Sequence, residues 1–272
     1  DSVVIGNTGT WSYTTPVLAE GNHVLTIRET DPAGNQSGPS AGFTVVVDSV
    51  SATPVITNVT DNVGNAATTV VSGGLTNDAT PTLTGTADAN SVVTLFDGGT
   101  QIAVVTADNT GTWTFTPDTA LGEGSHSFTV RATDPQGNLS AVSAPWSVVV
   151  DLTAPTVPTL DNVNDDVSGG VQGNLTSGQV TNDSTPTISG TGLAGSTIHI
   201  MNNGTQIGTT TVDGSGNWSF TPTTPLGDGS YALRAYATDA AGNASANSSV
   251  FAFTVDTAAP GVPVVTSVVD DI

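Results

Sequence analysis

The sequence predicts an all-β protein built of tandem β-sandwich domains, and two observations carry this prediction. Short runs rich in Val, Ile, Thr and Phe alternate with Gly, Asn, Asp and Pro, as in strands and turns, and no segment has a helical period. The motif Asp-x-x-Gly-Asn begins at Asp31, Asp134 and Asp239, with spacings of 103 and 105 residues. A period of about one domain length indicates complete globular units in tandem rather than a solenoid of short repeats.

The Asp residues that close each apolar run divide the chain into two complete units and two partial ones. Residues 50–152 and 153–257 each contain the full set of motifs, residues 1–49 align with the second half of a unit, and residues 258–272 with the start of another. Seven short strands in about 100 residues predict an immunoglobulin-like Greek-key sandwich for each complete unit, and their succession predicts an extended rod. In the unit 153–257 we expect strands at 157–163, 186–191, 196–202, 205–212, 217–221, 230–238 and 248–255.

Side-chain alternation supports these strands and indicates the core. Phe128, Val130 and Ala132 fall on one face of the sixth strand of the unit 50–152, with polar residues between them. Trp113 and Trp218 occupy the same place in successive units, and we expect both in the core, although an exposed tryptophan could also stack on a sugar.

The charge balance excludes several classes of function. The chain has 24 acidic residues against three Arg and no Lys, a net charge of −21, so binding to nucleic acid or to anionic membranes is not expected. It has no Cys, which excludes disulfides and disfavours zinc, and no apolar stretch of about 20 residues that would insert into a bilayer. Of the acids, 21 are Asp and only three are Glu, and short carboxylates in Gly- and Asn-rich turns suit calcium ligation or turn capping.

The order of the strands predicts a calcium site at each junction between units. The turn between the last two strands of a unit should lie at the end of the sandwich where the first strand begins. This turn would then face the Asp that closes the preceding unit. A closing carboxylate and an Asx-rich turn together supply the oxygen ligands that Ca²⁺ prefers. The same turn sequence also suits simple capping, with Asp bonded to its own backbone and Gly at positive φ. The predicted ligands at the junctions are Asp48, Asp134, Asn138, Asp151, Asp239, Asn243 and Asp256.

A second acidic cluster follows the first strand of each unit. The segment between the first and second strands runs about 20 residues with little strand signal, which is long for a sandwich unless something organises it. Adjacent carboxylates repel each other, and a divalent ion would reverse that cost. The predicted calcium ligands here are Asp61, Asp165 and Asp166, with Asp270 and Asp271 in the partial unit at the end of the sequence.

Five stretches of the chain resemble a known family. They are 77–85 (NDATPTLTG), 182–190 (NDSTPTISG), 216–222 (GNWSFTP), 237–243 (ATDAAGN) and 255–260 (VDTAAP). They are similar to the bacterial Ig-like repeats of giant type I-secreted non-fimbrial adhesins, and the resemblance covers essentially the whole chain. It implies a calcium-rigidified monomeric stalk, secreted or on the bacterial cell surface, whose partners are the neighbouring repeats and, through the whole adhesin, the host cell surface. The segment 48–54 departs from the family's Asp-x-Thr-Ala-Pro linker.

Catalysis is not expected from this sequence. Carboxylates that recur in the turns of every unit do not build one catalytic cleft, and His23 and His126 share a repeat position that Tyr231 takes in the next unit. We therefore expect a mechanical spacer, a stalk segment that holds a distal adhesive module away from the cell. The alternative is that these units themselves bind host glycans or a protein receptor.

Overall fold

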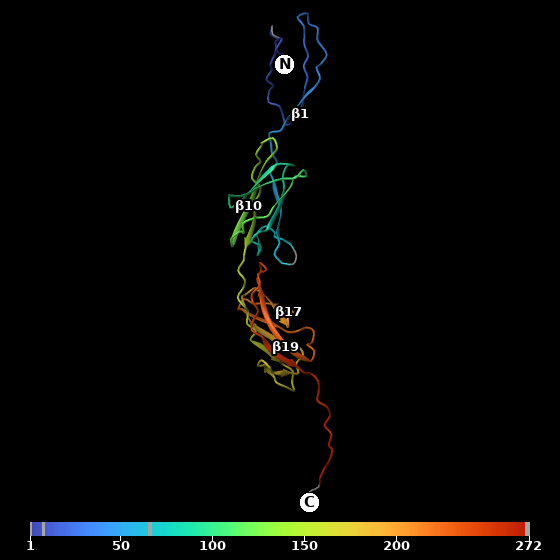
Figure 1. The fold of residues 1–272 in the computed structure, drawn as a ribbon, viewed down its shortest axis with the longest axis vertical. Coiled ribbons are helices and arrows are strands. Elements are labelled where there is room, and N and C mark those ends of the chain that lie inside the picture. Colours follow the sequence, from blue (N-terminus) through green and yellow to red (C-terminus); the bar gives the residue numbers. More distant parts are fainter. Residues whose placement is uncertain (1, 7–8, 65–66, 270–272) are drawn as a thin grey trace. The chain divides into compact units, whose positions relative to one another are not determined.

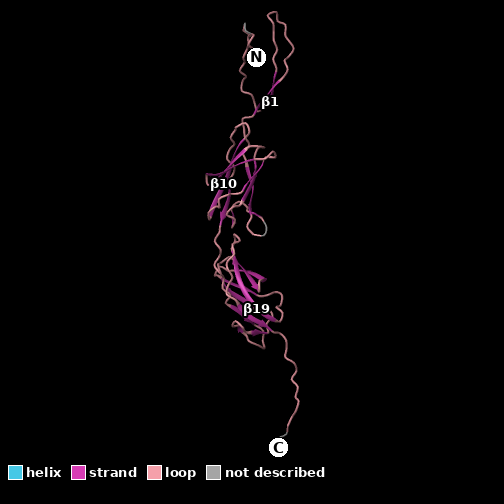
Figure 2. Ribbon diagram, in the orientation of Figure 1, coloured by secondary structure: helices cyan, strands magenta, loops and turns pink. Residues whose placement is uncertain are grey.

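A computed structural model describes residues 2–6, 9–64 and 67–269, and these residues form strands, turns and loops (Figures 1 and 2). No described segment forms a helix of the length and apolarity needed to cross a membrane. The first pair of strands, β1 (Gly21–Leu25) and β2 (Phe43–Val47), is an antiparallel two-stranded sheet with His23 opposite Val45. The Phe43 side chain is exposed.

The repeat that spans residues 153–257 is a sandwich of two sheets. One sheet has the order β13-β12-β15-β18 and the other the order β14-β20-β19-β16-β17. The bounds of its strands are β12 (Asn162–Asp165), β13 (Gly173–Asn174), β14 (Val180–Thr181), β15 (Thr187–Thr191), β16 (Thr197–Asn202), β17 (Thr205–Thr211), β18 (Asn217–Phe220), β19 (Gly229–Thr238) and β20 (Phe251–Val255). Figure 1 labels β17 and β19 in this sandwich. All described pairings are antiparallel except that of β14 with β20, which is parallel.

The repeat that spans residues 50–152 has the same strand order. Its sheets run β4-β3-β6-β9 and β5-β11-β10-β7-β8, again with a parallel pair, β5 with β11. The bounds are β3 (Val55–Asp61), β4 (Thr68–Thr69), β5 (Gly74–Thr76), β6 (Thr82–Thr86), β7 (Val92–Asp97), β8 (Thr100–Thr106), β9 (Thr112–Phe115), β10 (Gly124–Thr133) and β11 (Trp146–Val150). The all-β, immunoglobulin-like prediction for the fold is confirmed.

Two expected strands of the unit 153–257 begin later than the sequence predicts. The sequence predicts the first strand at 157–163, whereas β12 begins at Asn162. Pro158 has no N–H to donate, and before β12 only isolated bonds of Thr159 and Asp161 join the chain to β15. The sequence predicts the last strand at 248–255, whereas β20 begins at Phe251. Ser248 replaces the ladder there, since its hydroxyl accepts the Ala235 N–H at 2.9 Å.

The alternation predicted for the core is confirmed. Phe128, Val130 and Ala132 are all buried, and the side chains of Trp113 and Trp218 are only 2% and 3% exposed. These two indoles are core residues, because so little of either ring remains for a sugar to stack on.

The place of each indole requires a glycine on the neighbouring strand. A Cβ at Gly190 would lie 2.2 Å from the Thr159 carbonyl oxygen and 2.9 Å from Trp218, and a Cβ at Gly85 would lie 2.2 Å from Trp113. The two repeats share the same spacing from Gly to Trp, and this shared spacing follows from packing.

Candidate functional site

The Asp-x-x-Gly-Asn turn is built by its own Asp. The Asp134 Oδ1 accepts the backbone N–H groups of Gln136 and Asn138, at 2.9 and 2.8 Å, and the Gly137 N–H donates to the Asp134 carbonyl. Gly137 has a φ of 96°, which a residue with a side chain rarely adopts. The turns that begin at Asp31 and Asp239 have the same bonds. These are the bonds that the capping interpretation predicts.

In the turns that begin at Asp134 and Asp239, the final Asn bonds to the closing Asp of the preceding segment. The Asn243 Nδ2 donates to the Asp239 Oδ2 at 3.0 Å and to the Asp151 backbone carbonyl at 2.8 Å. In the repeat before it, the Asn138 Nδ2 donates in the same way to the Asp48 carbonyl at 3.0 Å. The structure thus brings together the turn and the closing residue, as strand order predicts, but through the closing residue's main-chain oxygen and not its carboxylate.

The carboxylates of the closing Asp residues bond to the linker itself. The Asp151 Oδ1 accepts the Thr153 N–H, and the Asp256 Oδ1 accepts the Ala258 N–H, both at 3.1 Å. Each closing Asp therefore forms a short turn with the residues that follow it.

An acidic residue that the sequence analysis did not single out also binds each linker. The Glu123 Oε1 accepts the Leu152 N–H at 3.0 Å and the Thr153 hydroxyl at 2.5 Å, and Glu20 bonds in the same way to Ser49. Asp228 holds the equivalent position in the next repeat. Two of the three Glu residues in the chain, Glu20 and Glu123, occupy this repeat position, each directly before a Gly. This repetition is the sequence signal that could have identified the position.

These hydrogen bonds stabilise the ionised carboxylates. Donation from Thr153, then from the Leu152 N–H, lowers the pKa of Glu123, and the N–H and hydroxyl of Thr257 lower the pKa of Asp228. Burial alone would raise the pKa of Asp134, but the bonds from its own turn outweigh that effect and the pKa lies below its usual value.

The segment between the first two strands of each repeat is organised by a buried Asp-Thr-Asp network. Asp165 is only 1% exposed, and its carboxylate accepts the Thr181 hydroxyl and, at 2.9 Å, the Val167 N–H. The Thr181 hydroxyl oxygen in turn accepts the Asp183 N–H at 3.0 Å. The other repeat has the same network with Asp61, Thr76 and Asp78.

The two adjacent acids of this segment do not share a site. Asp165 is buried whereas Asp166 is exposed, because successive side chains at a strand end point to opposite faces. Over residues 2–6, 9–64 and 67–269, no group of three His, Asp or Glu side chains lies close enough together to hold a metal ion by itself. Calcium binding stays a prediction. Asp270 and Asp271 lie outside the described residues.

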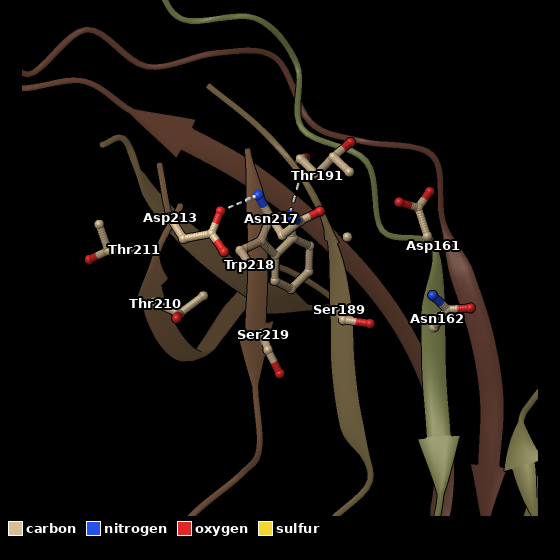
Figure 3. Close-up of a pocket in the computed structure, with 11 residues that line it drawn as sticks. Asp161, Asn162, Ser189, Thr191, Thr210, Thr211, Asp213, Asn217, Trp218 and Ser219 are labelled. Atoms are coloured by element: carbon tan, nitrogen blue, oxygen red, sulfur yellow. Dashed lines mark hydrogen bonds between the residues drawn. The ribbon is translucent and has the colours of Figure 1, made fainter. Parts of the chain in front are cut away.

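A shallow polar groove lies above Trp218 in the repeat 153–257. It encloses about 500 Å³, and Figure 3 shows Asp213, Asn217 and Thr191 beside the indole. The Trp218 Nε1 donates to the Thr191 carbonyl at 3.1 Å, and the Asp213 Oδ1 accepts the Asn217 N–H at 2.9 Å. Since the indole is covered and its donor is bonded, the groove offers no stacking platform.

The hydrogen bonds of Asp108, which precedes β9, lead us to expect that the stability of the repeat 50–152 depends on pH. Its Oδ1 accepts the Thr110 hydroxyl and the N–H groups of Thr112 and Thr110, and these bonds, the Thr110 hydroxyl first, lower its pKa below 3.8. The stabilisation is therefore complete above the usual pKa and is lost as the pH falls through the lower folded value. Asp108→Asn should be less stable than the native chain near neutral pH, and the difference should shrink below about pH 4. Urea unfolding across this range measures it, and a difference that stays constant with pH would contradict the assignment.

Comparison with known families identifies the repeats. A family model described as "Bacterial Ig-like domain" matches residues 2–49, 55–152 and 155–257. Two curated proteins of Cellulomonas fimi are similar, Exoglucanase B and Exoglucanase A, each 31% identical, over 94% and 96% of this chain. The chain spans only 22% and 29% of the length of these relatives.

Two solved structures match at lower sequence identity. The fibronectin(III)-like modules of Clostridium thermocellum CbhA align with 68% of this chain and 90% of their own, at 17% identity and a TM-score of 0.45. A tetra-tandem repeat in the extending region of a large adhesion protein aligns with 89% of this chain and 69% of its own, at 23% identity and a TM-score of 0.28.

Proposed function

Because this chain belongs to the bacterial Ig-like domain family, we propose that it is a non-catalytic spacer, a stalk segment that separates the functional parts of a longer extracellular protein. The observation that carries the proposal is the bond from Asn243 to the Asp151 carbonyl. It joins the turn of one repeat to the linker before it, and the same bond recurs between Asn138 and Asp48. A linker bonded in this way has fewer accessible conformations than a free one.

The composition supports the extracellular part of this proposal. The chain has no Cys, so it needs no reducing compartment, and its net charge of −21 opposes self-association. The adhesin role is the finer proposal: the spacer would present a distal adhesive module to host cells or surfaces.

Calcium binding belongs to the same finer proposal. Carboxylate and amide oxygens of the closing Asp and of the following turn, as at Asp151, Asp239 and Asn243, are the ligand types that Ca²⁺ takes. Bound calcium would neutralise part of the acidic repulsion and stiffen the linker. Secretion as a flexible chain through a type I pathway would then precede stiffening outside the cell.

Small-angle scattering and thermal melting, each with calcium and with a chelator, test both levels of the proposal. A spacer should keep a large maximum dimension at every concentration measured, and calcium binding should raise both that dimension and the melting temperature. A compact particle in both conditions would contradict the spacer. Unchanged values on addition of calcium would contradict the calcium proposal alone.

A pair of variants locates the calcium effect. Asp151→Ser and Asp239→Ser should abolish any response at the linker, whereas Asp97→Ser, which removes a carboxylate bonded to His126 at 2.6 Å, should leave it intact. An equal loss in all three variants would mean that the ion binds nonspecifically to an acidic surface.

A further inference from the structure

The last strand of each repeat lies between two neighbouring strands of its sheet, and the chain continues from it into the linker. β20 lies between β14 and β19, and its antiparallel pairing with β19 begins with Gly229 opposite Val255. One residue further along this register, Asp228 stands opposite Asp256. The acidic side chain before the strand is therefore placed beside the first residues of the linker.

On this flank a single carboxylate oxygen binds two linker donors. The Asp228 Oδ1 accepts the N–H of Thr257 at 2.9 Å and its hydroxyl at 2.8 Å. The Glu123 Oε1 accepts the Leu152 N–H and the Thr153 hydroxyl in the same manner. The acid and the linker amide that it binds are 29 residues apart in both repeats.

On the opposite flank the same linkers continue the parallel ladder. The Asp151 N–H donates to the Thr76 carbonyl and the Asp256 N–H to the Thr181 carbonyl, both at 2.9 Å. Each linker is thus bonded on both sides over the first two or three residues after its strand. The direction in which the chain leaves the sandwich is fixed by these two sets of bonds.

An acidic residue at this position has no packing role. Glu123 and Asp228 are exposed, and each binds the residue that follows another acid, Asp151 or Asp256, in a chain that is already strongly negative. Like charges on neighbouring segments are unfavourable. An ionised acceptor repays that cost only through the strong bonds it forms with the linker donors.

We propose that Glu123 and Asp228 are positioning residues for the linkers, each fixing the exit direction of the chain by binding the linker amide and hydroxyl. The proposal rests on the spacer function, because a fixed exit direction matters only where successive repeats must hold a defined orientation. It needs no metal ion, since every bond that carries it is made by the protein.

Hydrogen exchange of single amides, followed by NMR on the full chain in chelator, tests the proposal. Glu123→Ala should speed exchange of the Leu152 amide by about tenfold or more and leave the Thr257 amide unchanged, and Asp228→Ala should do the reverse. Each variant therefore serves as the control for the other. Glu123→Asp should restore slow exchange at Leu152, because Asp serves at this position in the next repeat.

Residual dipolar couplings of the same samples separate the two levels of the inference. Glu123→Ala should weaken the common alignment of the repeats 50–152 and 153–257 while the melting temperature stays unchanged. Unchanged exchange at both amides would overturn the positioning role even if the native repeats align together. Independent alignment of the native repeats, with exchange still responding to Glu123→Ala, would instead overturn the spacer function on which the inference rests.

Discussion

Replacing Asp165 with alanine is expected to lower the free energy of unfolding of the repeat 153–257 by about 3 kcal/mol. The change leaves the buried Thr181 hydroxyl and the Val167 N–H without their acceptor, and each lost bond to a charged partner costs about 1.5 kcal/mol or more. Calorimetry of the full chain measures the effect. The repeat 50–152 is the internal reference, because its own Asp61 network is untouched.

Two further measurements separate hydrogen bonding from metal binding at Asp165. Thr181→Val removes the hydroxyl donor, and the double variant with Asp165→Ala should cost less than the sum of the single changes, because the two side chains share one bond. The loss should be the same in chelator as in calcium. A loss that appears only with calcium would assign Asp165 to a metal site and contradict the network interpretation.

Trp218→Ala is expected to destabilise the same repeat by about 3 to 5 kcal/mol, the range for deletion of a large buried aromatic side chain. The indole is almost fully buried against Gly190, whose missing side chain makes room for it. Urea unfolding monitored by circular dichroism measures the loss. A cost below about 1 kcal/mol would show that the ring packs against solvent rather than core.

The corresponding residue in the other repeat provides a matched control for the indole N–H. The Trp218 Nε1 donates to the Thr191 carbonyl, whereas the buried Trp113 Nε1 has no hydrogen-bond partner among the described residues. Trp218→Phe should therefore cost about 1 kcal/mol more than Trp113→Phe, because only the first change removes a bond. Equal costs would mean that this bond contributes nothing to stability.

The strands that alternation marks clearly could be predicted from the sequence, and the short ones could not. The sixth strand of each unit shows the two-residue period, as at Phe128, Val130 and Ala132, and β10 and β19 lie where it predicts. β13 and β14 have two residues each, too few to show any period. They form by pairing with strands distant in the sequence, β13 with β12 and β14 with β20, and the bond between Asp165 and Thr181 joins segments 16 residues apart, so they are a tertiary effect.

The same limit applies to the candidate site. Strand order predicts that the Asp-x-x-Gly-Asn turn faces the closing Asp of the preceding unit. The bond from Asn243 to Asp151 agrees with this prediction. The choice of the carbonyl over the carboxylate depends on the orientation of one amide, which composition does not encode. Which of Asp165 and Asp166 is buried depends on which side chain of the strand end points to the core. A shift of the register by one residue would exchange them, and the sequence of two adjacent acids is the same in either case.

The parallel pairing of β14 with β20 determines how a repeat responds to tension. The bonds that join the two segments include Gly178 N–H to the Ala252 carbonyl at 2.7 Å, Thr254 N–H to the Gln179 carbonyl at 2.9 Å, and Asp256 N–H to the Thr181 carbonyl at 2.9 Å. A force that pulls the chain outward before β14 and after β20 slides the two strands along each other, so these bonds are sheared together instead of opening one after another. Bonds that must break simultaneously resist force better than bonds that break in sequence, and each sandwich would therefore rupture in a single step when the chain is stretched.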